Sequence, residues 1–218
     1  MDRKKIPITE GWFRLWYGMD AKNANGWEIF FDIFQRYCES HRYYHDYGHV
    51  IQLLGEFKGV RHLCQNPNAV EVDLYCHDVI YVPGARDNEE RSAEFTCGML
   101  RHARVAEPFI REASRLVLLS KKHTAAKNDT DGCISIDLDL SILGQPPAVY
   151  DVYEERVRKE WVLTKAVSEE EFIHGRAAFL TRFLRRESVY LTSYFREKYE
   201  DAAQKNLKRS RENLMQFA

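Results

Sequence analysis

Apolar side chains recur at three- and four-residue spacing along almost the whole chain, and this periodicity is typical of amphipathic helices. Residues 27–37 illustrate it, because their large apolar side chains form a stripe that begins just after Asn25, a favourable N-cap. The only strand-like run is Cys133 to Ile136. No internal repeat divides the 218 residues, and this length can bury one sizeable core. We therefore predict an all-α, single-domain helical bundle over residues 1–218, with its core at about 12–207 and its last helices, at 190–217, packed on that core.

Prolines in first turns, side-chain caps and polar stretches set the expected boundaries of the helices. Residues 190–217 give one or two helices. The other expected elements are an apolar segment from Pro67 to about Tyr81 closed by Pro83-Gly84, a helix capped by Asp87 or Asn88, a helix from Pro108 to about His123, a loop from Thr124 to Gly132, a helix after Pro146-Pro147, and a helix after the capping-box sequence that starts at Ser168.

Composition narrows the classes of partner. Lys and Arg number 32 against 33 Asp and Glu, so the net charge of −1 favours neither a nucleic-acid duplex nor an acidic membrane. The five cysteines are scattered and odd in number, which favours a reducing compartment over a disulfide framework. The charged residues 1–7 lack a following apolar stretch, and no apolar run reaches membrane-spanning length. We therefore expect a cytoplasmic protein that binds neither duplex nucleic acid nor membrane.

The dipeptide His77-Asp78 ends a mostly apolar segment and is the strongest indication of chemistry in the sequence. Burying an imidazole beside a carboxylate is costly unless a partner satisfies both groups. A divalent cation does so, because a neutral nitrogen and an anionic oxygen together suit zinc, iron, manganese and related ions. The alternative is a helix-end pair, with the histidine cation at the carboxyl terminus and the aspartate capping a later turn.

Further metal-ligating residue types lie on both sides of this dipeptide. His45 and His49 are four residues apart and share a helix face if the helix begins early enough. His49 falls in an apolar row and therefore points inward, either as a ligand or as a core histidine. Asp139 lies among leucines and needs a partner, whereas Asp137 is more simply the N-cap of a short helix at 138–143.

In this order, His49, His77-Asp78 and Asp139 resemble the H…HD…D signature of the HD superfamily of metal-dependent phosphohydrolases, whose fold is all-helical. The similarity covers about residues 12–207 and includes motifs of a bacterial branch of predicted HD-superfamily hydrolases. These motifs are Arg42-Tyr43-Tyr44-His45 with His49-Val50, His77 to Tyr81, Asp87 to Ala93, Asp137 to Gly144, and Tyr150 to Glu160.

The resemblance implies that His49, His77, Asp78 and Asp139 bind a divalent metal cation, which would be Zn, Mn, Fe, Mg or Ni. Two imidazoles and two carboxylates leave positions on such an ion for water and a phosphate oxygen. The implied reaction is hydrolysis of a small phosphorylated substrate, a phosphomonoester or phosphodiester and possibly a nucleotide, by a metal-activated water. Asp78 would also accept the proton of that water, and Glu89 would orient it.

A second group of residues is expected to bind the phosphate or a second metal, and each has a simpler alternative. His123 would otherwise be a cation at a helix carboxyl terminus, and His45 would otherwise orient a metal ligand. Arg158 would otherwise pair with Glu154 one helical turn away. The full group is His45, Arg91, Lys122, His123 and Arg158.

Two other functions fit the same residues. An HD-type di-iron oxygenase needs extra histidines between the HD pair and the last aspartate, and His102 and His123 fall in that interval. A non-catalytic helical domain that binds a metal or a nucleotide needs only the ligands. Whatever the function, the apolar-striped helices near the carboxyl end could form a homodimer surface.

Overall fold

The computed structural model describes residues 9–22 and 25–216, and the expectations for residues 1–7 and 217 lie outside this part of the chain. Every regular element in the described part is a helix, which confirms the all-α class. The elements are α1 (Thr9–Gly18), α2 (Gly26–Tyr37), α3 (Tyr47–Val60), η2 (Arg61–Leu63), α4 (Pro67–Cys76), α5 (Asn88–His102), α6 (Glu107–Leu119), α7 (Thr130–Asp139), η3 (Leu140–Gly144), α8 (Pro147–Val162), α9 (Glu169–Leu184) and α10 (Ser193–Met215).

Local capping explains most of the helix starts that the sequence predicts. The Asn25 side chain accepts a hydrogen bond of 3.2 Å from Trp27 N at the start of α2. At the start of α9, Ser168 and Glu171 form both bonds of the capping box. Pro67 occupies the first turn of α4, where its missing N–H costs nothing.

Two expectations about local structure are wrong. Cys133 to Ile136 is helical, because it lies within α7. The loop expected from Thr124 to Gly132 is also shorter, since Asp129 accepts a hydrogen bond of 3.0 Å from Gly132 N and α7 begins at Thr130. Residues near the carboxyl end form one long helix, α10.

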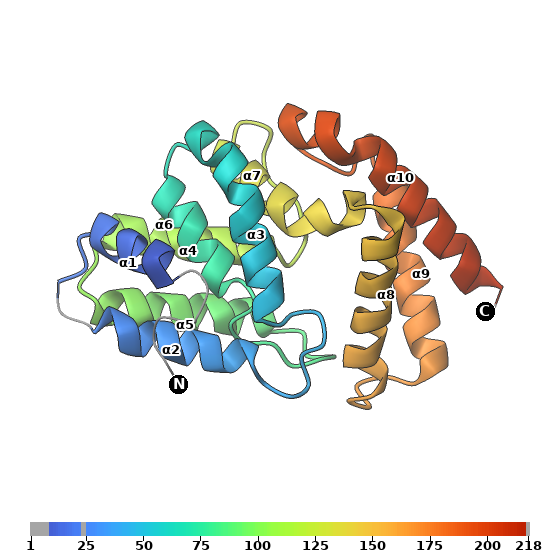
Figure 1. The fold of residues 1–218 in the computed structure, drawn as a ribbon, viewed down its shortest axis with the longest axis horizontal. Coiled ribbons are helices and arrows are strands. Elements are labelled where there is room, and N and C mark those ends of the chain that lie inside the picture. Colours follow the sequence, from blue (N-terminus) through green and yellow to red (C-terminus); the bar gives the residue numbers. More distant parts are fainter. Residues whose placement is uncertain (1–8, 23–24, 217–218) are drawn as a thin grey trace.

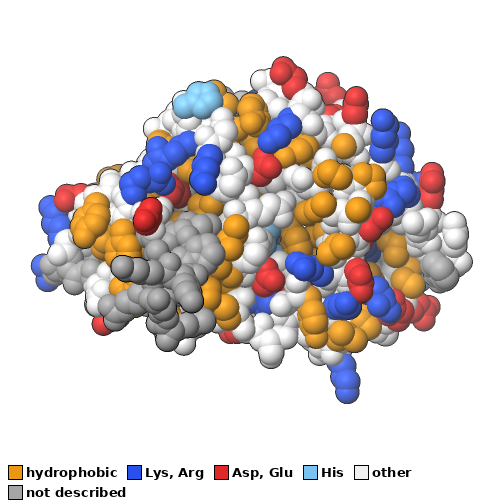
Figure 2. Space-filling view, in the orientation of Figure 1, with side chains coloured by type: hydrophobic (Ala, Val, Ile, Leu, Met, Phe, Trp, Pro, Cys, Tyr) orange, Lys and Arg blue, Asp and Glu red, His pale blue; other side chains and the backbone are white. Residues whose placement is uncertain are grey.

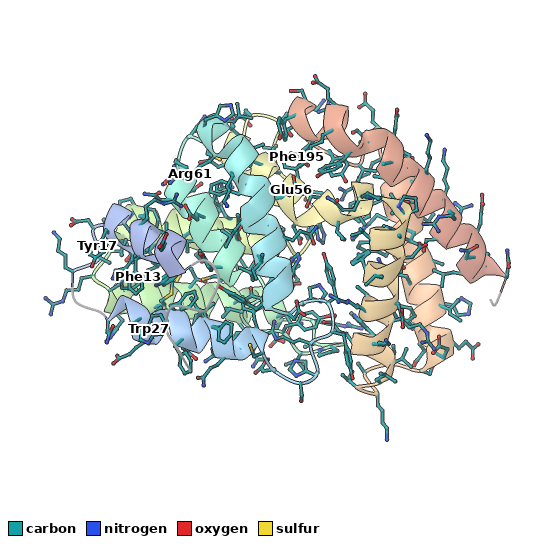
Figure 3. The ribbon with its side chains drawn as sticks, viewed as in Figure 1. Phe13, Tyr17, Trp27, Glu56, Arg61 and Phe195 are labelled. Carbon is teal, nitrogen blue, oxygen red and sulfur yellow. The ribbon has the colours of Figure 1, made fainter. Side chains whose placement is uncertain are left out.

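In Figure 1, α1 to α6 lie on the left and α8 to α10 on the right, with α7 and η3 leading from one group to the other. Within the left group, Phe13 of α1 stacks on Trp27 of α2 with 6.2 Å between ring centroids (Figure 3). Where α3 meets α10, Glu56 accepts hydrogen bonds of 2.7 Å from both Lys198 and Tyr199. α10 packs mainly on α9 and η3.

A continuous cluster of buried apolar side chains extends from Trp12 in α1 to Leu207 in α10. Two short helices lie almost entirely inside it: residues 69–76 of α4 are all buried, and so are residues 131–138 of α7. Because α4 and α7 are enclosed, the residues at their carboxyl ends also lie inside the molecule. Those residues are His77-Asp78, directly after α4, and Asp139, the last residue of α7.

The surface carries both signs of charge. On the face drawn in Figure 2, basic and acidic side chains alternate over the region of α8 to α10, with apolar side chains between them. Among the residues that the structure describes, no helix has both the length and the apolar character needed to cross a lipid bilayer.

Candidate metal centre and its cavity

A buried arginine fixes the backbone that carries the HD dipeptide. Arg42 donates hydrogen bonds of 2.7 Å to the carbonyl oxygen of Asp78 and 3.1 Å to that of Val79. The backbone N–H of His77 continues the helical pattern of α4 by donating to the Asp73 carbonyl at 2.8 Å. α4 therefore ends at the dipeptide, and Arg42 satisfies two backbone carbonyl groups of the segment that follows the helix.

The other ligand candidates come from two further helices. Asp46 caps α3 by accepting hydrogen bonds of 2.8 Å from Gly48 N and 3.2 Å from His49 N. His49 therefore lies in the first turn of α3, and it is only 3% exposed. Asp139 reaches the same place from the end of α7.

These side chains converge. Nε2 of His49 lies 3.2 Å from Nε2 of His77, and the two nitrogens lie 3.5 and 3.7 Å from Oδ1 of Asp139. Donor atoms of these three residues all lie within 4.8 Å of one another. Ligands bound tetrahedrally to one ion at about 2.0–2.2 Å are about 3.3–3.6 Å apart, so the spacing fits a shared cation.

Asp78 lies at the edge of this group. Its Oδ2 is 3.1 Å from Nε2 of His77, but it does not belong to the set of mutually close donors formed by His49, His77 and Asp139. Among the predicted metal residues, the structure thus brings three together tightly and adds Asp78 through its contact with His77.

The electrostatics of the cluster favour a positive charge. Burial alone would lower the pKa of His77, but the carboxylates of Asp78 and Asp139 outweigh it and raise that pKa to about 10. Burial also raises the pKa of the two carboxyl groups, yet the surrounding histidines hold both well below their usual range. By contrast, burial lowers the pKa of His49 and favours the neutral imidazole that a metal ligand requires. A divalent cation bound here would take the place of the His77 proton, and the two carboxylates and two neutral imidazoles would then form a suitable donor set.

His45 is held by a residue that the sequence analysis did not single out. Nδ1 of His45 lies 2.7 Å from Oε2 of the buried Glu160, and it is the donor because a carboxylate has no hydrogen to give. The other carboxylate oxygen accepts backbone N–H groups of Tyr43, Tyr44 and His45 at 2.8–2.9 Å. Tyr81 donates to Glu160 as well, at 3.2 Å. Nε2 of His45 is thereby turned toward Asp78, 3.9 Å from Oδ2.

His123 contacts the cluster from its other side. Its Nε2 lies 3.2 Å from Oδ2 of Asp139, the oxygen not shared with His49 and His77. The ring packs edge-on against Phe183, with 5.9 Å between centroids. His123 therefore orients Asp139 and stands beside the candidate metal position.

A cavity of about 480 Å³ opens next to these side chains. Asp78 and Asp139 form part of its wall, and so do His45 and His123. Glu89 also lines it, and burial raises the pKa of its carboxyl group. The volume lies within the range of small-molecule sites.

Other predicted residues lie away from the cluster. Arg91, Lys122 and His102 are exposed and do not line the cavity. Arg158 is exposed, does not line the cavity and forms an ion pair of 2.5 Å with Glu169 instead of the expected pair with Glu154.

The expectation that Asp137 caps a short helix is wrong. Asp137 lies inside α7 and accepts hydrogen bonds of 2.7 Å from the backbone N–H groups of Leu191 and Thr192 and from the Thr192 hydroxyl. These three bonds give its buried carboxylate a structural role at the start of α10.

Comparison with known proteins does not extend this picture. No family model matches the chain, and neither a curated protein nor a solved structure matches it.

Proposed function

We propose that the chain is a metal-dependent phosphohydrolase that cleaves a phosphomonoester or a phosphodiester. The observation that carries the proposal is the meeting of His49, His77 and Asp139, from three separate helical segments, beside a cavity large enough for a substrate. Asp78 adds a second carboxylate to this group. A divalent cation held there, whether Zn, Mn, Fe, Mg or Ni, would polarise a phosphoryl oxygen and lower the pKa of a water molecule.

The residues around the cluster have separate tasks in this proposal. Asp78 lies where it can accept a proton from water, since its carboxylate faces the cavity. His45, with Nδ1 bonded to Glu160, can hold a proton at Nε2 for the oxygen of the leaving group. Glu89 lines the same cavity and can hydrogen-bond the attacking water.

The test is hydrolysis by purified protein that has been stripped of metal and reloaded with each candidate ion. We expect turnover of p-nitrophenyl phosphate, of its diester or of a nucleotide panel, and loss of at least about a hundredfold in Asp78→Asn. Asp151→Asn is the matched control, because Asp151 is an exposed carboxylate on α8 that pairs with Arg209. Full activity in Asp78→Asn would contradict the role given to Asp78. Metal binding without turnover of any ester would refute the enzyme and support a non-catalytic metal-binding domain.

The di-iron alternative has one supporting observation and one against it. Asp139 presents Oδ1 to His49 and His77 and Oδ2 to His123, so its carboxylate could bridge two ions. A second ion would need further histidine ligands, and His102 is exposed at the end of α5, outside the cavity wall. We therefore propose the phosphohydrolase as the function and treat iron stoichiometry as the test of the alternative.

A further inference from the structure

Aromatic side chains dominate the cavity wall beyond the candidate metal centre. Rings stack or meet edge-on with planar groups, and their faces exclude water from whatever lies between them. Aliphatic side chains of η3 and α8 complete the same wall. The aromatic residues that line it are Tyr44, Tyr81, Tyr153, Trp161, Phe172 and Phe179.

Charges in the wall are mainly negative. Four carboxylates line the cavity, those of Asp78, Glu89, Asp139 and Glu171. Among the described lining residues, Arg176 is the one Lys or Arg.

This arginine is already engaged. Its guanidinium donates to both carboxylate oxygens of Glu154, at 2.7 and 3.1 Å, and to the Tyr153 hydroxyl at 2.7 Å. Arg176 is also only 8% exposed. Binding of a diphosphate or triphosphate calls for additional cationic groups, and this wall offers none that is unpaired.

A glycine keeps the aromatic part of the cavity open. Phe172, Gly175, Arg176 and Phe179 follow one face of α9 at helical spacing, and all four line the cavity. Gly175 is exposed, so it lies where the cavity opens to solvent, and a Cβ atom added there would meet no atom within 4 Å. Glycine weakens a helix interior, and neither a turn nor a positive φ requires it at this position.

We propose, on the basis of the phosphohydrolase function above, that the substrate is the phosphomonoester of a flat apolar alcohol and that Gly175 leaves the space for its apolar body. The phosphoryl group lies at the metal cluster, and the body lies between the aromatic residues of the wall. Gly175 acts as a specificity residue, because a large side chain there, between Phe172 and Phe179 on the same helix face, would narrow the opening through which the body enters.

Binding of 1-naphthyl phosphate to the metal-loaded full chain, measured by calorimetry, tests this proposal. We expect it to bind at least tenfold more tightly than glycerol 2-phosphate, whose body is small and polar, and at least tenfold more tightly than ATP. Gly175→Leu should weaken naphthyl phosphate binding at least tenfold and leave glycerol 2-phosphate binding and metal content unchanged.

Gly98→Leu is the matched control. Gly98 also lies within a helix, is exposed, and has open space where a Cβ would be, but it lies outside the cavity wall. Both variants replace a helical glycine with a better helix former, so their thermal unfolding temperatures should not fall.

Two outcomes would overturn the proposal: ATP or glycerol 2-phosphate binding as tightly as naphthyl phosphate, or unchanged naphthyl phosphate affinity in Gly175→Leu. Binding of 1-naphthol separates this question from catalysis. If Gly175→Leu weakens naphthol binding but the protein hydrolyses no phosphate ester, the apolar binding site is supported and the phosphohydrolase function is refuted.

Discussion

Replacing Glu160 with glutamine should destabilise the fold strongly, although the two side chains have nearly the same shape. Glu160 is fully buried, and its carboxylate accepts five hydrogen bonds from the segment that leads into α3 and from Tyr81. In Glu160→Gln the amide oxygen can keep the three backbone donors. The amide NH₂ group then faces Nδ1 of His45 and the Tyr81 hydroxyl, which both donate to the carboxylate in the wild type, so neither bond to a charged acceptor survives.

The magnitude follows from these lost bonds. A hydrogen bond to a buried charged group contributes about 1.5–3 kcal/mol, and two such bonds are lost. We expect the free energy of unfolding to fall by about 3–5 kcal/mol, the range for breaking a buried charged pair. In urea this corresponds to a midpoint lower by about 1–2.5 M for a slope of about 2–3 kcal/mol per M.

Urea unfolding followed by circular dichroism measures the effect. Glu155→Gln is the control, because Glu155 is an exposed residue of the same helix that pairs with Lys159. Its midpoint should stay at the wild-type value. If Glu160→Gln also unfolded at the wild-type midpoint, the reasoning about the buried carboxylate would be wrong.

Three further predictions concern stability. Burial raises the pKa of the Glu160 carboxyl group, but the charge and hydrogen bonds of His45 outweigh burial and lower that pKa below 4.5. The stabilisation by the carboxylate is therefore complete above about pH 4.5 and is lost as the pH falls. In acid titrations, the difference in unfolding free energy between wild type and Glu160→Gln should narrow. Asp137→Ala removes the acceptor of two partly buried backbone N–H groups and should cost about 2–4 kcal/mol in urea unfolding, whereas Asp201→Ala, at an exposed position of α10, should cost almost nothing. Ser168→Ala removes one bond of the capping box and should cost about 1 kcal/mol in thermal unfolding, and an unchanged unfolding temperature would show that the cap contributes nothing.

The sequence predicts the amphipathic helices well because their determinants are local. The caps at Asn25 and Ser168 lie within three residues of the groups that they satisfy. Prediction from periodicity fails for α7, because residues 131–138 are buried on every side and show no apolar stripe. Without that stripe, the short run Cys133 to Ile136, in which isoleucine alternates with small residues, resembles a strand. The role of Asp137 was missed for a different reason: its partners lie 54 and 55 residues further along the chain.

The residues of the candidate site were likewise predicted only in part. Motif order predicted that His49, His77, Asp78 and Asp139 meet, and the structure brings three of them together with Asp78 beside His77. Arg158 was expected at the site, but Glu160 reaches it instead. A usable signal was present, because Glu160 follows Tyr153 at the spacing of one helix face, and a carboxylate on a buried face needs partners. Which partners it has could not be predicted, because His45 is 115 residues away in the sequence.

Anomalous diffraction from crystals grown with Mn²⁺ or Zn²⁺ tests the proposed metal centre most directly. We predict one strong peak bonded to Nε2 of His49, Nε2 of His77 and a carboxylate oxygen of Asp139, with Asp78 beside it, and no such peak in crystals of Asp139→Ala. Ions bound only elsewhere on the protein, or a peak at the cluster that persists in Asp139→Ala, would contradict the account.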